Sequence, residues 1–138
     1  MRVTIAPSVA KGEIIAPPSK SIAHRALICA ALSRCSTIHR VDFSEDIEAT
    51  LRCLQALGAS VTRQGDSVTL GGLNPFVIPS CTILDCGESG STLRFLLPLC
   101  LLSSVPVLLT GSSRLLERPL DVYEEICRQQ NLMFVRSN

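Results

Sequence analysis

The sequence is poor in aromatic residues and in lysine. Aromatic side chains make up 4% of its 138 residues and tryptophan is absent, which argues against a surface that stacks single-stranded nucleic acid. The formal net charge is +1, so the chain has no basic excess of the kind that a polyanion partner usually requires. Only two lysines accompany eleven arginines. One of the two, Lys20, lies in the stretch PPSKSIAHRAL.

Long hydrophobic runs are also missing. The run Phe95–Leu102 is too short to span a bilayer, and charges and prolines interrupt residues 1–17, unlike the apolar core of a signal peptide. Hydrophobic residues make up 46% and charged residues 18% of the chain, which is typical of a globular domain. We therefore expect a soluble, cytoplasmic protein.

The seven cysteines form no C-x-x-C pair. Most lie in apolar runs, so we expect buried free thiols in a reducing compartment rather than disulfides. His24 and His39 have no carboxylate or cysteine at ligand spacing, and we expect neither a metal nor a cofactor. Cys86 borders a glycine-rich loop but has no paired base, which favours packing over a nucleophilic role.

Hydrophobic periodicity predicts alternating strands and helices. We expect strands at residues 2–5, 13–16, 36–41, 60–63, 67–70, 81–85, 105–110 and 133–135. We expect helices at residues 19–32, 44–57, 91–102 and 118–130, with a kink or early stop at Pro98 and with Pro119 at the first position of the last helix. This order reads β-α-β-α-β-β and then β-α-β-α-β, an internal repeat of an α/β (α+β) fold.

The second copy of the repeat lacks its last strand. A missing strand would leave an unpaired sheet edge and an unsealed core, so we expect the chain to be a fragment that contains an incomplete domain. A complete domain with an irregular tail is the alternative.

Two loops before predicted helices carry cations and hydrogen-bond donors. The first loop, PPSKSIAHR (residues 17–25), places Lys20 at a helix start, where free N–H groups favour anions. Ser21 and Arg25 lie four residues apart on one face, and Arg25 offers a bidentate fork. The second loop, CGESGSTLR (residues 86–94), has Gly90 for close backbone approach and ends at Arg94.

The third loop, TGSSRLLERPL (residues 110–120), spaces Arg114 and Arg118 by four. Each loop alone also reads as ordinary structure: a capped helix, a tight turn, and a surface loop with a Glu117–Arg118 pair. Because three turns before helices at one end of a parallel sheet can converge, together they favour a small ligand with more than one negative group. Asp46 and Glu88 either orient the basic groups or are solvated surface residues.

The stretches PPSKSIAHRALI, GESGSTLRFL and TGSSRLLERPL, in this order, resemble the EPSP synthase (3-phosphoshikimate 1-carboxyvinyltransferase) family. That family transfers the enolpyruvyl group of phosphoenolpyruvate to the 5-hydroxyl of shikimate 3-phosphate and releases phosphate. The step belongs to the shikimate pathway, which leads to chorismate and the aromatic amino acids. Glyphosate is a phosphoenolpyruvate mimic that should fit the same site.

The resemblance also implies roles for individual residues. Lys20, Ser21 and Arg25 would bind shikimate 3-phosphate, and Lys20 would also bind phosphoenolpyruvate together with Gly90 and Arg118. Arg94 and Arg114 match further basic positions of the family. Two residues depart from its pattern: Glu88 stands where asparagine is usual, and Phe95 replaces a frequent proline.

The family's fold has two similar domains, each with three β-α-β-α-β-β units around a pseudo-threefold axis, an inside-out α/β barrel. Residues 1–17 would then hold N-terminal strands that cross to an absent second domain, and residues 18–138 would form an incomplete N-terminal domain. The family's acid–base carboxylates lie in the absent part, so we expect this chain alone to be inactive. The full-length protein is expected to be a monomer.

Two alternatives remain open at this point. The related UDP-N-acetylglucosamine enolpyruvyl transferase shares the fold but carries a Lys-Asn pair near the first helix and a reactive loop cysteine; Ser21 and Arg25 argue against it. The alternative outside enzymes is a stand-alone module that binds small anions.

Overall fold

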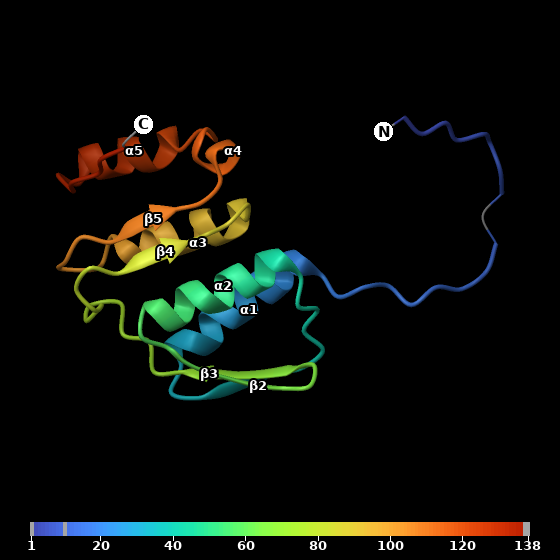
Figure 1. The fold of residues 1–138 in the computed structure, drawn as a ribbon, viewed down its shortest axis with the longest axis horizontal. Coiled ribbons are helices and arrows are strands. Elements are labelled where there is room, and N and C mark those ends of the chain that lie inside the picture. The colour runs from blue at the N-terminus through green and yellow to red at the C-terminus, as the bar shows by residue number, and fades with distance from the viewer. Residues whose placement is uncertain (1, 10, 137–138) are drawn as a thin grey trace.

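The computed structural model of the chain describes residues 2–9 and 11–136. Met1, Ala10, Ser137 and Asn138, which belong to the predicted segments 1–17 and 18–138, lie outside the described residues. The helices are α1 (Lys20–Leu32), α2 (Glu45–Ala56), α3 (Gly90–Cys100), α4 (Ser113–Leu116) and α5 (Asp121–Gln129) (Figure 1). The strands are β1 (Ser36–Ile38), β2 (Ser60–Gln64), β3 (Ser67–Gly71), β4 (Ile83–Asp85) and β5 (Leu108–Thr110).

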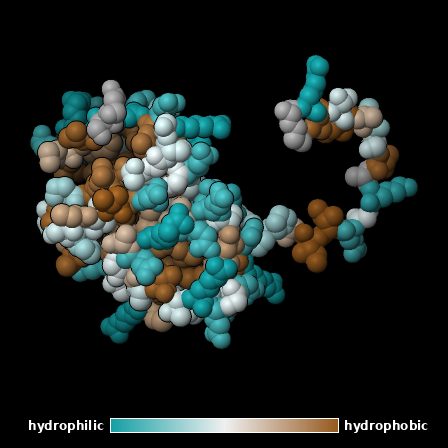
Figure 2. Space-filling view, in the orientation of Figure 1, coloured by the Kyte–Doolittle hydropathy of each residue, from teal (hydrophilic) through white to brown (hydrophobic). Residues whose placement is uncertain are grey.

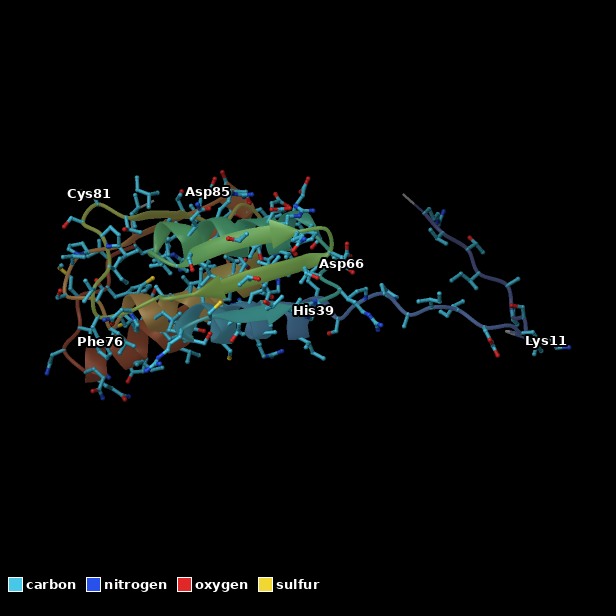
Figure 3. All side chains as sticks on the ribbon, turned by 90° about the horizontal axis from the view of Figure 1, so that it is seen from below. Lys11, His39, Asp66, Phe76, Cys81 and Asp85 are labelled. Carbon is cyan, nitrogen blue, oxygen red and sulfur yellow. The ribbon has the colours of Figure 1, made fainter. Side chains whose placement is uncertain are left out.

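The first sheet is antiparallel and has the strand order β1-β3-β2. β2 and β3 form the predicted hairpin, in which Gln64 pairs with Ser67 across a two-residue turn. Gly65 in this turn has φ +59°, a left-handed conformation that glycine adopts readily. Asp66 and His39 lie at the same end of the sheet (Figure 3), where His39 Nδ1 is 2.9 Å from Ser67 Oγ.

The second sheet is the parallel pair β4–β5, with Ile83 opposite Leu108 and Asp85 opposite Thr110. The expectation of one parallel sheet below all three loops is therefore wrong in part. The second and third loops do follow the carboxyl ends of parallel strands, but the described residues before the first loop form no strand. In the three-stranded sheet only β2 and β3 are joined by a short turn, and β1 is separated from its partner β3 by α2 and β2. The parallel pair β4–β5 requires a crossover, which α3 provides.

The core lies between the helices and the two sheets. α2 occupies the centre, in contact with α1, α3 and β4 (Figure 1). Its buried apolar residues, among them Ile47 and Leu54, recur at helical spacing, and Gly58 with φ +104° follows its C-cap. The predicted helices at 19–32 and 44–57 are thus confirmed, with Ser19 and Ser44 as N-caps.

The strands predicted at residues 2–5 and 13–16 are wrong for the described residues. Residues 2–9 and 11–19 form an extended, exposed segment that leaves the body of the molecule (Figure 1). A strand needs a neighbouring strand to satisfy its backbone groups, and none of the described residues pairs with this segment. Its apolar side chains are 65% to 99% exposed (Figure 2): Val3, Ile5, Val9, Ile14 and Ile15.

The C-terminal prediction needs two corrections. Ser112 caps a short helix, α4, by accepting a hydrogen bond from the backbone N–H of Leu115, so α5 begins only at Asp121 and Pro119 precedes it. The strand predicted at residues 133–135 is not formed. Pro98 lies inside α3, which continues to Cys100. In the described part of the chain, no helix is both long and apolar enough to cross a membrane.

Candidate anion-binding site

Lys20 lies at the N-terminus of α1 and reaches across to α2. The hydroxyl of Ser19 accepts a hydrogen bond from the backbone N–H of Ile22 and caps the helix. The Lys20 ammonium donates to the Asp46 carboxylate at 2.9 Å, and the two side chains are 53% and 32% exposed. An ion pair this exposed contributes at most about 1 kcal/mol to stability. Asp46 therefore orients the lysine more than it stabilises the fold.

Arg25 lies one turn further along α1. Its guanidinium donates to the carbonyl oxygen of Ser21 at 2.9 Å and stands 5.0 Å from the ring centroid of Phe95 on α3. A guanidinium at this distance from an aromatic face makes a favourable cation–π contact. Phe95 thus helps to orient the arginine of the first loop.

The second and third loops are joined through their backbones. Cys86 N–H donates to the Thr110 carbonyl and Ser112 N–H donates to the Gly87 carbonyl, both at 2.8 Å. Gly87 has φ +58°, which favours glycine at this turn. A β-carbon on Gly111 would lie only 2.6 Å from the Gly87 oxygen. The close approach of the two loops therefore depends on glycine at position 111.

Gly90 and Arg118 are in direct contact. Gly90 is the first residue of α3, after the N-cap Ser89. A β-carbon on Gly90 would lie 3.5 Å from Arg118 Cζ and closer still to Arg118 Nη1. The guanidinium therefore lies over the open backbone at a helix N-terminus, where free N–H groups and a positive charge can act on the same anion.

Three further arginines lie in or next to these loops. The guanidinium of Arg94 points to the Pro119 carbonyl at 3.5 Å, and its own carbonyl accepts from the Tyr123 hydroxyl at 3.0 Å. Arg114 is exposed on α4. Arg136 donates to the carbonyls of Leu116 and Arg118. Arg136 therefore ties the end of the described chain to the third loop.

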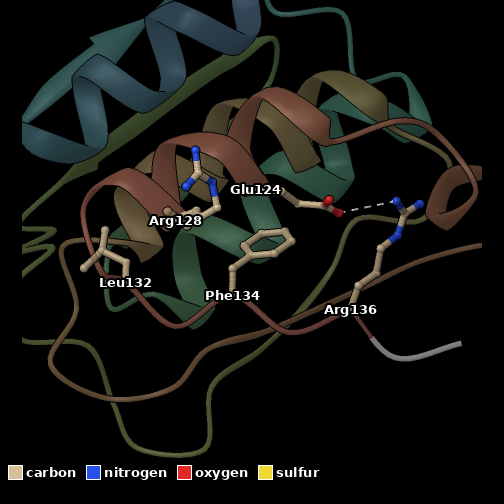
Figure 4. A pocket seen from close by; sticks show the side chains of 6 residues that line it. Glu124, Arg128, Leu132, Phe134 and Arg136 are labelled. Atoms are coloured by element: carbon tan, nitrogen blue, oxygen red, sulfur yellow. Dashed lines mark ion pairs between the residues drawn. The ribbon is translucent and has the colours of Figure 1, made fainter.

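A hollow of about 410 Å³ runs along α5 (Figure 4). Its charged groups already have partners: Arg136 pairs with Glu124 at 3.7 Å and Arg128 with Glu125 at 2.7 Å. Phe134 lies beside them. With its cations neutralised in this way, this hollow is a weak candidate for an anion site.

Glu88 and Asp46 border a second hollow of about 430 Å³, together with Glu45 and Glu48 from the first turn of α2. Glu88 is exposed. It adds negative charge on the α2 side of the second loop, where Arg52 is the basic residue of the lining.

Two buried thiols, Cys53 and Cys86, lie beside the second loop, and the Cys86 thiol resists ionisation. The Cys53 thiol donates to the Asp85 carbonyl at 3.4 Å, next to Cys86. A hydrogen bond with Cys53 and burial raise the pKa of the Cys86 thiol, and burial raises the pKa of Cys100 to about 12. Because the thiolate is the nucleophile, Cys86 is a packing residue here. Among the described residues, no three His, Cys, Asp or Glu side chains are placed to hold a metal ion.

The arrangement can hold anions at two neighbouring helix starts. Lys20 and Arg25 provide the cations at the start of α1, and Arg118 provides the cation beside Gly90 at the start of α3. Sequence reasoning did not anticipate the Arg25–Phe95 contact or the role of Thr92, whose hydroxyl lies 3.3 Å from the Asp46 carbonyl oxygen. Neither has a local sequence signal, because both contacts join separate helices.

The fold and this loop arrangement define a mixed α/β partial domain, and two solved structures that resemble it are both structures of EPSP synthase. The structure of EPSP synthase from Acinetobacter baumannii superposes with a TM-score of 0.77 at 23% identity, covering 88% of this chain and 28% of that one. A second structure of EPSP synthase from the same organism gives 0.75 at 24% identity.

The sequence comparisons lead to the family. Residues 5–131 match the sequence profile of EPSP synthase (3-phosphoshikimate 1-carboxyvinyltransferase), and the chain belongs to this family of shikimate-pathway transferases. The 3-phosphoshikimate 1-carboxyvinyltransferase of a Clostridium perfringens strain is 44% identical over 134 residues. That of Clostridioides difficile is 43% identical over 141 residues. The chain spans about a third of the length of these relatives, 32% in each.

Proposed function

We propose that these residues form one wall of the substrate site in a longer enzyme. This enzyme transfers the enolpyruvyl group of phosphoenolpyruvate to the 5-hydroxyl of shikimate 3-phosphate. The contact of Arg118 with Gly90 at the start of α3 supports this most directly. It brings together two of the motifs that the family resemblance singled out, at a helix end suited to a phosphate or carboxylate.

Each residue has a proposed role. Lys20, Ser21 and Arg25 bind shikimate 3-phosphate. Lys20 also contacts phosphoenolpyruvate, whose charged groups bind at Gly90 and Arg118. Arg94 and Arg114 contribute longer-range positive potential. Asp46 holds the Lys20 ammonium in place, in line with their 2.9 Å contact.

The reaction needs more than this wall. The 5-hydroxyl gives up its proton and attacks C2 of phosphoenolpyruvate while the C3 methylene of phosphoenolpyruvate takes up a proton. The tetrahedral intermediate then loses phosphate together with a proton from the new methyl group, which restores the double bond. These steps require positioned acid and base groups in a closed cleft. We place those groups, a second domain and the third β-α-β-α-β-β unit in the rest of a longer chain that acts as a monomer in the cytoplasm. The seven free cysteines suit that reducing compartment.

Titration with shikimate 3-phosphate tests the proposed binding role. Lys20→Ala should weaken its binding to the 138-residue chain by about tenfold, because a charge-assisted contact is lost. Lys11→Ala is the matched control, since Lys11 is the other lysine and lies on the extended segment. Equal affinity of the two variants, or a preference for UDP-N-acetylglucosamine, would argue against the proposal.

A phosphate-release assay tests the proposal that this chain binds substrate while the acid and base groups lie elsewhere in a longer chain. The 138-residue chain should show no phosphate release that depends on both substrates, because one wall of the cleft cannot supply the acid and base. Substrate-dependent turnover by the purified chain would mean that the catalytic groups lie within these residues.

A further inference from the structure

Two buried polar side chains lie directly below the ion pair of Lys20 and Asp46. His24 and Thr50 follow these residues by four positions on α1 and α2, which places them on the same faces one turn deeper. His24 Nδ1 lies 2.8 Å from Thr50 Oγ1. The two helices are thus joined by a second polar contact, whose residues are both 0% exposed.

The contact continues into α3. Thr50 Oγ1 lies 2.6 Å from Thr92 Oγ1, which in turn lies 2.7 Å from Ser89 Oγ. Ser89 is the N-cap of α3, and its hydroxyl also accepts from the backbone N–H of Thr92 at 3.2 Å. These four residues, which we name the polar chain, connect the helix that carries Lys20 to the helix that begins at Gly90.

The number of protons limits how the polar chain can be arranged. A neutral imidazole has one N–H, and each hydroxyl has one O–H. If the imidazole proton is on Nδ1, His24 donates to Thr50, Thr50 to Thr92, and Thr92 to Ser89, which fills all three contacts. The Asp46 carbonyl is a longer alternative acceptor for both threonines, at 3.2 and 3.3 Å.

Donation in the opposite direction, from Ser89 towards His24, is disfavoured at the histidine. It would put the imidazole proton on Nε2, which has no hydrogen-bond partner among the described residues. A buried N–H without an acceptor is costly and rare. The ring also stands edge-on to Phe95, 6.4 Å between centroids, which offers no oxygen acceptor. The Nδ1–H form leaves Nε2 as an unpartnered acceptor instead, and it agrees with the contact at the other end, where the Thr92 hydroxyl donates to the Ser89 oxygen. The Ser89 hydroxyl proton is then not used within the polar chain and lies beside Gly90.

We propose that His24 is a positioning residue of the anion site: as the Nδ1–H tautomer it sets the direction of the polar chain and keeps the Ser89 hydroxyl proton free at the start of α3. The proposal rests on the proposed function, because the anion served by this helix start is phosphoenolpyruvate or its mimic. His24 acts through Thr50 and Thr92 and touches no substrate.

The charges around His24 support a neutral ring. Burial lowers the pKa of His24, the Asp46 carboxylate opposes this, and the cations Lys20 and Arg25 lower the pKa further. From α3, the group facing the ring is the uncharged Phe95. The imidazole is therefore neutral near pH 7 and free to hold a single tautomer.

Nitrogen-15 NMR of the unliganded 138-residue chain tests the tautomer directly. His24 should be fixed as Nδ1–H and remain neutral as the pH falls through 6.5, the ordinary value for histidine. His39 is an internal control, because it also contacts a hydroxyl, that of Ser67, but is exposed. An Nε2–H tautomer, or a His24 ring that averages between the two tautomers or becomes protonated above pH 6.5, would overturn the proposal without any ligand.

Inorganic phosphate then serves as the probe for the site, followed at the Gly90 amide. His24→Asn keeps an N–H donor near the Nδ1 position and should bind within about twofold of the parent chain, whereas His24→Leu should bind about fivefold more weakly. Thr92→Val, which breaks the polar chain without changing His24, should show the same loss. If Asn and Leu behave alike at position 24, His24 has only a packing role.

The two proposals can fail separately. If phosphate does not shift the NMR resonance of the Gly90 amide in the parent chain, the anion site proposed above is wrong. Two measurements without ligand then test the direction of the polar chain. One is the tautomer of His24 in the parent chain, and the other is the Gly90 amide chemical shift in the His24→Asn and Thr92→Val variants. Asn should preserve that shift and Val should change it, and the reverse pattern would refute the proposal even if His24→Leu does not fold.

Discussion

Replacing Gly71 with alanine should destabilise the chain by about 3 kcal/mol, because the added methyl group has no room. Gly71 ends β3 and is buried against the turn between α1 and β1. A β-carbon there would lie 2.7 Å from the Arg34 carbonyl carbon and 2.9 Å from Cys35 Cα, and closer still to the Arg34 oxygen. All three are backbone atoms, so relief requires α1 or the sheet to move.

Urea unfolding of the 138-residue chain measures this effect, as does a fall in the melting temperature of roughly 10 °C. The cause would be steric, since Gly71 has no left-handed φ. Gly90→Ala is a matched control: it adds the same methyl group, also at a position without positive φ, but against the tip of a flexible side chain. Equal destabilisation by the two substitutions would refute the steric explanation.

Gly90→Ala, the control for stability, should itself have a large effect on ligand binding. In a full-length chain that contains these residues, Gly90→Ala should weaken binding of phosphoenolpyruvate or glyphosate by about a hundredfold. The methyl group occupies the space over the α3 N-terminus and displaces the Arg118 guanidinium, which removes a charge-assisted contact. Shikimate 3-phosphate affinity should remain within about twofold, because Lys20 and Arg25 lie on α1.

Calorimetric titration with each ligand separates these effects. Arg118→Gln is the companion variant, since it removes the cation and leaves Gly90 unchanged. Combined with Gly90→Ala it should add little further loss, because both changes act on one contact. Unchanged inhibition by glyphosate in Gly90→Ala would show that Gly90 does not line this site.

The elements that sequence reasoning predicted well are those with local signals. Ser19 and Ser44 mark the starts of α1 and α2, and Gly65 marks the hairpin turn. The strands predicted at residues 2–5 and 13–16 failed because alternation of residue types does not provide a pairing partner. α4 was missed because its single turn depends on the Ser112 cap and is too short to show helical periodicity.

The features of the candidate site that could be predicted are likewise those with local sequence signals. Glycines, serines and cations before helices identified the three loops, because these residue types bind anions through local geometry. That Arg118 lies on Gly90, or that Lys20 reaches Asp46, depends on how separate helices pack, and spacing along the chain carries no such information. The polar chain from His24 to Ser89 was invisible for the same reason: each member taken alone is an ordinary helical residue.

The separation of the strands into two sheets bears on the order in which the chain folds. The first part, α1, α2 and the antiparallel sheet, contains the β2–β3 hairpin, whose two-residue turn closes quickly. The second part, the parallel pair, must wait for α3 to cross over it. Lys20 belongs to the first part, while Gly90 and Arg118 belong to the second. A ligand that needs all three therefore binds only after the slower part has joined. By mass action, such a ligand would stabilise the last step of folding and would act as a probe of completed assembly.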